Sequence, residues 1–312
     1  MSNVFISTSS FGQVSPEPLE ALDRAGCSYR LNPHGRRLDP EETREFLVGI
    51  EGLIAGTERL DREILAAAVG LKAVSRVGVG LENIDLVAAQ ELGIRVSNTP
   101  EPPARAVAEL ALGGILALLR HLCPADRELR RGNWNKPMGR LLSGSTAGII
   151  GTGRAGRALI GLLAPFRCRV LAADLQPDSA WAEESSVEYT GIDELITASD
   201  MVSLHVPLTH ETRHLIDRRR IALMKPGAIL VNCARGGLVD EAALAENLRS
   251  GNIGGAYLDV FETEPYHGEL IELPNTLLSP HIGSYASECR LQMELEAVSN
   301  LIRALAGDEA RG

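Results

Sequence analysis

The chain has 312 residues, 45% of them hydrophobic, and a formal net charge of −10 at pH 7. This composition is that of a folded globular protein, and it excludes a disordered, collagen-like or disulfide-stapled chain. The length suggests about two domains. The acidic balance argues against a nucleic-acid partner, because a negative surface repels phosphate backbones.

Five cysteines are present, and none of them forms a CxxC pair. An odd number without paired spacing argues against a metal site and a disulfide framework, so we expect reduced thiols. The N-terminus has no basic region followed by an apolar run, and the most apolar stretch, residues 110–119, is far shorter than the roughly 20 residues that span a bilayer. We therefore expect a cytoplasmic protein with no membrane partner.

Short apolar runs alternate with helical patterns in the first third of the chain. The pattern predicts strands at residues 4–7, 52–55, 73–77 and 95–97, with helices over 61–68 and 85–92. Ser15-Pro16-Glu17 and Asp39-Pro40-Glu41 indicate helix starts, because a capping side chain followed by proline suits a first turn. Such alternation is typical of crossover units on a parallel sheet.

A proline-rich stretch, TPEPP at residues 99–103, predicts a stiff hinge, because proline fixes φ and donates no backbone hydrogen bond. A long apolar helix is expected from Ala104 to about His121. The polar segment 123–144 that follows is interpreted as an excursion from its domain and a candidate dimer arm.

The strand–helix alternation resumes more strongly from Thr146. Strands are predicted at residues 147–150, 169–173, 201–206, 228–232, 255–260 and 276–279, and a last helix over about 284–305. The second half is therefore also expected to form a parallel sheet covered by helices.

A GxGxxG motif directly follows the strand at 147–150 and opens the helical run 154–163. Its glycines are Gly151, Gly153 and Gly156. Such a loop lets the backbone approach a pyrophosphate, which the helix N-terminus then binds. The motif alone is equally compatible with an ordinary glycine turn.

Asp174 strengthens the dinucleotide interpretation. It ends the next strand at the spacing typical of a carboxylate that binds the adenosine ribose of NAD. The same carboxylate would repel a 2′-phosphate, which favours NAD over NADP. The alternative is a solvated strand end.

Four further polar residues follow predicted strands, where open parallel sheets bind ligands. Arg235, before two glycines, suits a planar carboxylate. Glu264 and His281 are candidates for acid–base chemistry, and His205 lies at a strand end near the expected cofactor site. Taken singly, each could instead be an ordinary loop or structural residue.

Several ordered segments together resemble the D-isomer-specific 2-hydroxyacid dehydrogenases, and within them the phosphoglycerate-dehydrogenase-like branch. The segments are RVGVGLENID at 76–85, GTGRAG at 151–156, LHVPLTHET at 204–212, NCARGGLVDE at 232–241, LDVFETEP at 258–265 and SPHIG at 279–283. The resemblance extends over essentially the whole chain.

The resemblance implies roles for particular residues. Arg235, Glu264 and His281 match the family's catalytic arginine, glutamate and histidine, and Cys233 is implied to be a small neighbour of the cofactor rather than a nucleophile. The implied cofactor-binding residues are Gly151, Gly153, Arg154, Ala155, Gly156, Asp174, His205, Val206, Pro207, Thr212, Cys233, Ala234, Arg235, Asp259, His281, Gly283 and Ser284, and the implied substrate-binding residues are Arg76, Val79, Gly80 and Arg235.

The family resemblance also implies an α/β fold of two Rossmann-like domains with parallel sheets, one flavodoxin-like and one dinucleotide-binding, with a cleft between them. The expected substrate domain comprises residues 1–98 and 285–312, and the expected NAD domain comprises residues 99–284. A homodimer through the long helix and the segment near Trp134 is implied as well. The expected partner is a small 2-hydroxy or 2-keto acid.

The substrate is less well indicated. D-3-phosphoglycerate dehydrogenase is the most similar activity, but Ala55 or Gly56 stands where that enzyme has a phosphate-binding arginine. Arg76 is the alternative phosphate contact, whereas Arg59 lies a few residues beyond that place. A glyoxylate or hydroxypyruvate reductase, a phosphite dehydrogenase and a non-enzymatic NAD(H)-sensing scaffold remain as alternatives, whereas Glu264 argues against a formate dehydrogenase, which has glutamine there.

Overall fold

The computed structural model describes residues 2–307, which form two compact units. Unit 1 comprises residues 1–103 and 284–312, and unit 2 comprises residues 104–283. The first boundary thus lies five residues beyond the expected one and the second lies one residue before it. Residues 308–312 of the expected substrate domain lie outside the described part of the chain.

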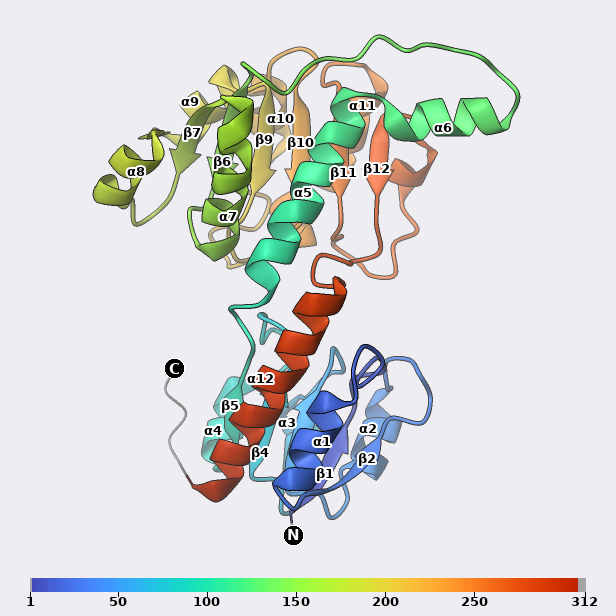
Figure 1. Cartoon of the computed structure of the whole chain (residues 1–312), viewed down its shortest axis with the longest axis vertical. Coiled ribbons are helices and arrows are strands. Elements are labelled where there is room, and N and C mark those ends of the chain that lie inside the picture. The colour runs from blue at the N-terminus through green and yellow to red at the C-terminus, as the bar shows by residue number, and fades with distance from the viewer. Residues whose placement is uncertain (1, 308–312) are drawn as a thin grey trace. The chain divides into compact units, whose positions relative to one another are not determined.

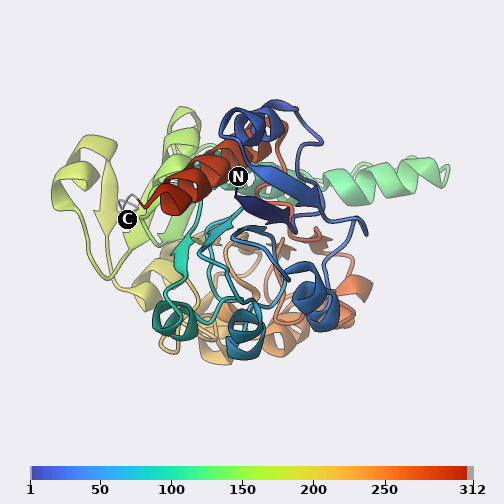
Figure 2. The same ribbon diagram turned by 90° about the horizontal axis from the view of Figure 1, so that it is seen from below.

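Unit 1 contains a five-stranded parallel sheet with the order β2-β1-β3-β4-β5, which is flavodoxin-like. Its strands are β1 (Asn3–Ile6), β2 (Ser28–Leu31), β3 (Gly52–Ala55), β4 (Ala73–Arg76) and β5 (Arg95–Ser97), and its helices are α1 (Glu17–Arg24), α2 (Pro40–Phe46), α3 (Arg62–Ala67), α4 (Leu86–Glu91) and α12 (Ser287–Ala306). Helices α1 and α12 cover one face of this sheet, and α2, α3 and α4 lie on the other (Figure 2).

Helix α12 returns to unit 1 and is tied to the loop after β1 by a buried ion pair. Arg290 lies 3.3 Å from Glu294 across one turn, and the Glu294 side chain is completely buried. Glu294 also accepts a hydrogen bond from Gly12 N at 2.9 Å, and Arg290 donates to Ser10 Oγ at 3.0 Å. These contacts stabilise the loop that follows β1.

Unit 2 contains a seven-stranded parallel sheet with the order β12-β11-β10-β9-β6-β7-β8. Its strands are β6 (Thr146–Ile150), β7 (Arg169–Ala173), β8 (Val187–Tyr189), β9 (Met201–Leu204), β10 (Ile229–Asn232), β11 (Gly255–Leu258) and β12 (Thr276–Leu278). Read from β8, this is the Rossmann order with one more strand. Strands β7 and β8 lie on one side of β6, and the later strands lie on its other side from β9 onward, so the strand order reverses between β6 and β9.

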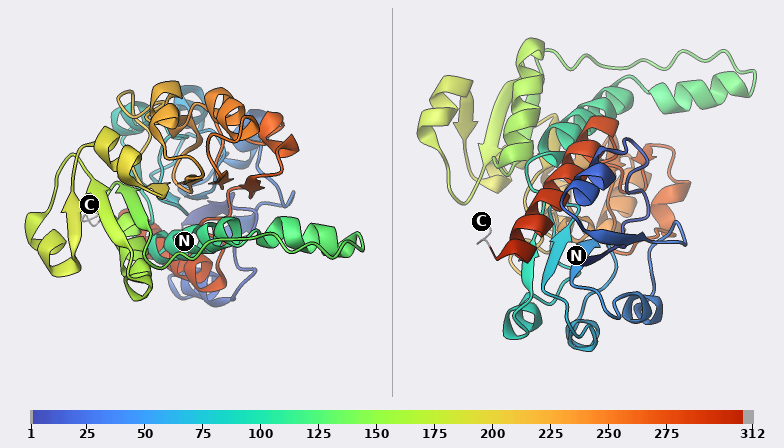
Figure 3. Two further views of the ribbon diagram at one scale, coloured as in Figure 1. Left: turned by 90° about the horizontal axis from the view of Figure 1, so that it is seen from above. Right: turned by 60° about the horizontal axis from the view of Figure 1, so that its bottom comes forward.

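Helices cover both faces of the sheet of unit 2 (Figures 1 and 3). These helices are α5 (Pro103–Leu119), α7 (Arg154–Leu163), α8 (Ser179–Ser185), α9 (Ile192–Ala198), α10 (Arg218–Leu223) and α11 (Glu241–Arg249), with short 3₁₀ turns at Ala164–Phe166, Gly236–Leu238 and Glu269–Glu272. One hydrophobic cluster joins α5, α7 and α8 to the sheet, and a second joins α9, α10 and α11 to it.

Aspartate caps begin many of these helices. Asp39 caps α2 in a capping box with Glu42, which confirms the start indicated by Asp39-Pro40-Glu41. At α1 the cap residue is Pro16 rather than Ser15, so the expected serine cap is wrong by one position. Ser15 Oγ nevertheless accepts a hydrogen bond from Glu17 N at 3.2 Å, which keeps its role in satisfying the first turn.

The expected irregular excursion at 123–144 is wrong in part, because it begins as a helix. Helix α6 (Leu122–Arg130) buries none of its residues and extends away from the sheet of unit 2 (Figure 1). The polar stretch beyond it is extended, with Trp134 78% exposed.

Among the described residues, no single helix is long and apolar enough to cross a membrane, although α5 and α6 together, bent by 62°, pass that test by length and composition.

Candidate active site

The glycine loop at the carboxyl end of β6 has the shape that a pyrophosphate requires. Gly151 has φ of +98°, and a Cβ there would lie 2.7 Å from the backbone of His205. A Cβ at Gly156 would lie 2.0 Å from Gly151 O, so the first and last glycines permit close packing of the loop. A Cβ at Gly153 would meet no atom within 4 Å, so its outer side is open.

Helix α7 begins directly after this open glycine, with Gly153 as its N-cap. The first-turn amides of Arg154 and Ala155 therefore lie at the positive end of the helix dipole, where an anion binds. The loop and the helix start thus fit the pyrophosphate of a dinucleotide.

Asp174 is held rigidly beside the loop. Its carboxylate accepts hydrogen bonds from Thr152 N at 2.6 Å, Thr152 Oγ1 at 2.9 Å and Gln176 N at 3.0 Å. Burial alone would raise the pKa of Asp174, but these hydrogen bonds outweigh burial and hold the pKa below its usual value. An ionised, oriented carboxylate at the end of β7 suits the ribose hydroxyls of NAD.

Thr152 was not singled out in the sequence. Its hydroxyl lies 2.8 Å from Tyr189 Oη as well as 2.9 Å from Asp174. Its position between the first two glycines was the only sequence signal for it. Its contact with Asp174, 22 residues further along the chain, exists only in the folded structure.

His205 directly follows β9, the strand next to β6 on the side away from β7. Its Nε2 lies 2.9 Å from Ser203 Oγ, while its Nδ1 is buried without a hydrogen-bond partner among the described residues. Burial lowers the pKa of His205 to about 4, so the ring is neutral near pH 7. Beyond it, Thr212 Oγ1 donates to Pro207 O at 2.7 Å and closes the loop that directly follows Val206.

The three expected catalytic residues all lie in unit 2, in loops that follow β10, β11 and β12. His281 Nδ1 lies 2.9 Å from Glu264 Oε2, and the two side chains are 48% and 39% exposed. Glu264 is itself oriented by Phe261 N, which donates to its Oε1 at 3.1 Å. Imidazole and carboxylate therefore form a hydrogen-bonded pair that solvent can reach.

The electrostatics of this pair favour a charged carboxylate. Burial would raise the pKa of Glu264, but the hydrogen bond and charge of His281 outweigh it, with a smaller contribution from Arg235. The pKa of Glu264 therefore lies below its usual value, and its carboxylate is positioned to stabilise an imidazolium.

Arg235 is presented by a tight loop after β10. Asn232 Nδ2 donates to Arg235 O at 2.8 Å, and Arg235 Nη1 donates to Ala234 O at 2.7 Å. A Cβ at Gly236 would lie 1.9 Å from the carbonyl carbon of Phe261. The glycine after Arg235 therefore lets this loop pack directly on the backbone that leads to Glu264.

Asp259 organises the loop that contains His281. Its carboxylate accepts hydrogen bonds from Ser279 Oγ, Ile282 N and Gly283 N at 2.6, 2.8 and 2.7 Å. Its backbone oxygen accepts from His281 N at 2.8 Å. Burial raises the pKa of Asp259, although these hydrogen bonds oppose the rise.

Cys233 is 6% exposed, and burial raises the pKa of its thiol. Such an environment does not generate a thiolate, so Cys233 is not an activated nucleophile.

Ser284, the last of the expected cofactor residues, falls in unit 1.

Three of the four expected substrate-binding residues, Arg76, Val79 and Gly80, lie in unit 1, where β4 ends. The fourth, Arg235, lies in unit 2. Arg76 Nη1 donates to Val77 O at 3.1 Å, and its guanidinium fills the space that a side chain at Gly78 would need. Val79 is 45% exposed, and its carbonyl accepts from Asn98 Nδ2 at 2.6 Å. The backbone of Val79 and Gly80 is therefore presented at the carboxyl edge of this sheet.

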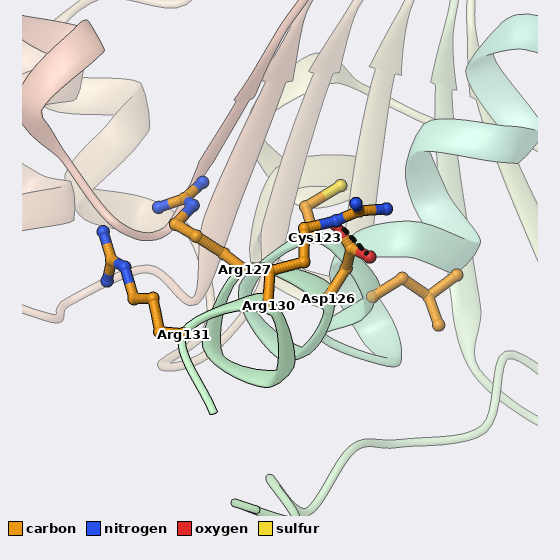
Figure 4. Close-up of a pocket in the computed structure, with 6 residues that line it drawn as sticks. Cys123, Asp126, Arg127, Arg130 and Arg131 are labelled. Atoms are coloured by element: carbon orange, nitrogen blue, oxygen red, sulfur yellow. Dashed lines mark hydrogen bonds and ion pairs between the residues drawn. The ribbon is translucent and has the colours of Figure 1, made fainter. Parts of the chain in front are cut away.

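An open hollow of about 600 Å³ lies along α6 and involves none of these residues (Figure 4). It is lined by Leu122, Cys123, Asp126, Arg127, Arg130 and Arg131. Arg130 is paired with Asp126 at 2.8 Å.

Among the described residues, no group of three or more His, Cys, Asp or Glu side chains could hold a metal ion.

Comparison with known proteins identifies the family. The model of the "D-isomer specific 2-hydroxyacid dehydrogenase, NAD binding domain" matches residues 112–283. The chain belongs to the D-isomer-specific 2-hydroxyacid dehydrogenases. As a member, it is an NAD-dependent oxidoreductase that acts on the CH–OH group of small 2-hydroxy acids, which confirms the predicted family, reaction and cofactor.

Curated relatives of this dehydrogenase carry several substrate names. Hydroxypyruvate reductase of Thermotoga maritima is 40% identical over 92% of this chain and 96% of its own length. Glyoxylate reductase of Thermofilum pendens is 41% identical over 95% and 91%. D-3-Phosphoglycerate dehydrogenase of Mycobacterium leprae is 40% identical over 82% of this chain but only 49% of its own length.

Solved structures share the whole fold. A protein from Thermus thermophilus superposes with a TM-score of 0.92 at 36% identity and covers 99% of both chains. D-Lactate dehydrogenase of Aquifex aeolicus, crystallised with NAD and lactic acid, has a TM-score of 0.85 at 30% identity and covers 98% of this chain and 96% of its own. The predicted class of two Rossmann-like α/β domains with parallel sheets is therefore confirmed.

Proposed function

We propose that this dehydrogenase reduces a small, unphosphorylated 2-keto acid, hydroxypyruvate or glyoxylate, with NADH. The observation that carries the proposal is the hydrogen bond of 2.9 Å between His281 Nδ1 and Glu264 Oε2. It leaves Nε2 as the nitrogen that exchanges a proton with the substrate oxygen, because the other nitrogen is bound to the carboxylate.

Each side chain has a distinct task in this mechanism. Bound NAD(H) supplies the hydride chemistry at C2 of the substrate. In reduction, His281 donates its proton from Nε2 to the developing alkoxide, and in oxidation the neutral ring accepts that proton. Glu264 stabilises the charged ring and fixes its orientation, as Phe261 N fixes the carboxylate.

Arg235 binds the substrate carboxylate and polarises the keto oxygen, since a guanidinium matches both in geometry and charge. In unit 1, the family resemblance assigns substrate binding to the backbone amides of Val79 and Gly80. Asp174 selects NAD(H), because the 2′-phosphate on the ribose of NADP(H) would face the negative charge of its carboxylate.

The preference for an unphosphorylated substrate rests on unit 1. Ala55 and Gly56 provide no cationic side chain after β3, and Arg59 is paired with Asp61 at 3.1 Å. The relatives matched over nearly their whole length are named hydroxypyruvate and glyoxylate reductases. D-3-Phosphoglycerate dehydrogenase is the second candidate, favoured by Arg76 at the end of β4 and by the mycobacterial relatives.

A homodimer and a cytoplasmic location belong to the same proposal. Helix α6 and the segment after it expose five large apolar side chains, a patch that suits a second copy of the chain. They are Leu122, Leu129, Trp134, Met138 and Leu141. Sedimentation of the wild type and of a Trp134→Ser, Leu141→Ser variant tests this assembly, which we expect the double substitution to weaken.

The reaction is tested by NADH oxidation with hydroxypyruvate, glyoxylate, pyruvate and phosphohydroxypyruvate, with NAD and phosphite as a further pair. His281→Asn is the decisive variant, because His281 has φ of +55° and asparagine tolerates that backbone well. We expect kcat to fall by about 10² to 10⁴.

His121→Asn is the matched control, since His121 has φ of +52° at the start of α6. Turnover by His281→Asn within a few-fold of the wild type would refute the proposed acid–base role. Tight NADH binding without turnover on any acid would favour the sensing scaffold instead.

A further inference from the structure

Tyr257 is a large polar side chain buried inside unit 2. It lies on β11, is 2% exposed, and belongs to the hydrophobic cluster that joins α5 to the sheet. A Cβ at Gly114 on α5 would lie 2.0 Å from Cδ1 of the Tyr257 ring, so the helix backbone packs directly on the ring. This contact restricts the position of the ring, and with it the position of the hydroxyl.

The hydroxyl of Tyr257 begins a chain of hydrogen bonds that leads to Asp259. Tyr257 Oη lies 2.9 Å from Ser279 Oγ, and Ser279 Oγ donates to Asp259 Oδ1 at 2.6 Å. Because the single proton of Ser279 is directed at the carboxylate, its oxygen accepts the proton of Tyr257. Burial raises the pKa of Tyr257, so the phenol keeps the proton that it donates.

Asp259 in turn holds the backbone around His281. Its two carboxylate oxygens accept from Ile282 N and Gly283 N, and its backbone oxygen accepts from His281 N. All residues of this chain of hydrogen bonds, and α5 as well from residue 104 onward, lie in unit 2. A displacement of the Tyr257 hydroxyl would therefore reach the turn that presents the imidazole.

We propose that Tyr257 is a positioning residue for the acid–base reaction, because it orients Ser279 and so keeps the Asp259 carboxylate in the geometry that presents His281. The inference rests on the proposed acid–base role of His281. It adds a residue that acts through Ser279 and Asp259 rather than on the reacting atoms. If Tyr257 only filled space beneath α5, phenylalanine would serve equally well, whereas the proposed role requires the hydroxyl.

Tyr257→Phe tests this requirement, because it removes the hydroxyl and keeps the ring that packs on α5. Kinetics are measured with NADH and whichever 2-keto acid of the panel above is reduced fastest. We expect kcat to fall by about 5-fold or more, and KM for the keto acid to stay within about twofold, because a hydrogen bond that orients Ser279 is lost. In an Asp259→Asn background the same substitution should change kcat by less than about twofold, since the connection to His281 is already broken.

Ser199→Ala is the matched control for the loss of a buried hydroxyl. Ser199 is completely buried in unit 2 and donates to Leu195 O at 2.6 Å, outside this chain of hydrogen bonds. We expect it to lower the free energy of unfolding and to leave kcat within about twofold of the wild type.

A second pair of variants perturbs Tyr257 from α5. Gly114→Ala would push a methyl group into the Tyr257 ring, so kcat should fall by about 5-fold or more. Gly113→Ala is its control, because a Cβ at Gly113 would meet no atom of the described residues within 4 Å. We expect Gly113→Ala to keep kcat within about twofold, since it only adds helix propensity.

The outcomes separate this inference from the proposed function. An unchanged kcat in folded Tyr257→Phe overturns the role of Tyr257 and leaves that of His281 intact. Independent, multiplying effects of Tyr257→Phe and Asp259→Asn on kcat also overturn it. If Tyr257→Phe does not fold, equal kcat values in Gly114→Ala and Gly113→Ala overturn it instead. Near-wild-type turnover by His281→Asn, or no turnover on any 2-keto acid, overturns the proposed function and the inference together.

Discussion

Asp259 Oδ2 lies 2.7 Å from the backbone nitrogen of Gly283, two residues beyond His281, the proposed acid–base residue. With Oδ1 accepting from Ile282 N and Ser279 Oγ, one buried carboxylate holds both ends of the turn that presents His281. The position of the imidazole is thus set by a residue of the neighbouring β11 loop.

Asp259→Asn is expected to lower kcat by at least about 10-fold with a smaller effect on KM, because one carboxylate oxygen would become an NH2 group that faces a backbone N–H donor. We also expect a loss of about 1 to 3 kcal/mol in the free energy of unfolding. Steady-state kinetics and urea denaturation measure the two effects. Asp200→Asn is the control, because Asp200 accepts from Thr146 N at the amino-terminal ends of the strands, away from His281. It should lower stability without changing kcat.

Glu264→Gln should change the pH dependence of reduction. Reduction requires protonated His281, and the ionised carboxylate of Glu264 stabilises that form. With a neutral amide the protonated ring is less favoured, so the loss of activity at rising pH should begin at a lower pH than in the wild type. Glu262→Gln, which binds His214 and Arg213 instead, should leave the profile unchanged, and an unshifted Glu264→Gln profile would contradict the assignment.

Asp174→Ala should weaken NADH binding by about 10-fold and relax the discrimination against NADPH, because the carboxylate both accepts ribose hydroxyls and repels a 2′-phosphate. Fluorescence titration with each nucleotide measures both effects. Thr152→Val retains the carboxylate but removes the hydroxyl that holds it at 2.9 Å. It should therefore weaken NADH binding less and keep the preference for NADH.

His205 should make the protein less stable in mild acid. Its folded pKa of about 4 lies below the ordinary value of 6.5, so between these values the unfolded chain binds a proton that the folded chain does not. Stability should therefore fall as pH decreases from about 6.5 to about 4, by up to about 3 kcal/mol. His205→Gln should remove this slope in denaturation at several pH values, whereas His210→Gln, at an exposed loop position, should retain it.

Much of the fold could be predicted because buried parallel strands are continuous apolar runs. The strands at 52–55 and 169–173 were predicted with the bounds of β3 and β7. The strand at 95–97 was also predicted with the bounds of β5, although RVS is not an apolar run and none of its residues is buried. The edge strands β2 and β8 were missed, since SYRL and VEY are short, polar and largely unburied. Helix α6 was missed for a related reason, because none of its residues is buried against the described part of the chain.

The site was predictable where residue type and strand-end position coincide, as for the pair formed by His281 and Glu264. It was not predictable where a partner comes from a distant strand. Tyr257 and Ser279 are 22 positions apart and meet only because β11 and β12 are neighbours in the sheet. Thr152 likewise meets Asp174 only after β6 and β7 have paired.

The contact between Gly236 and Phe261 has a consequence for anyone who redesigns this enzyme. A methyl group at position 236 would overlap the Phe261 carbonyl. The loop that carries Arg235 and the loop that carries Glu264 are therefore packed too closely to move independently. A library built at 236 would therefore select for glycine whatever substrate is offered. Changes in substrate range are better sought at positions that leave this contact between the two loops intact.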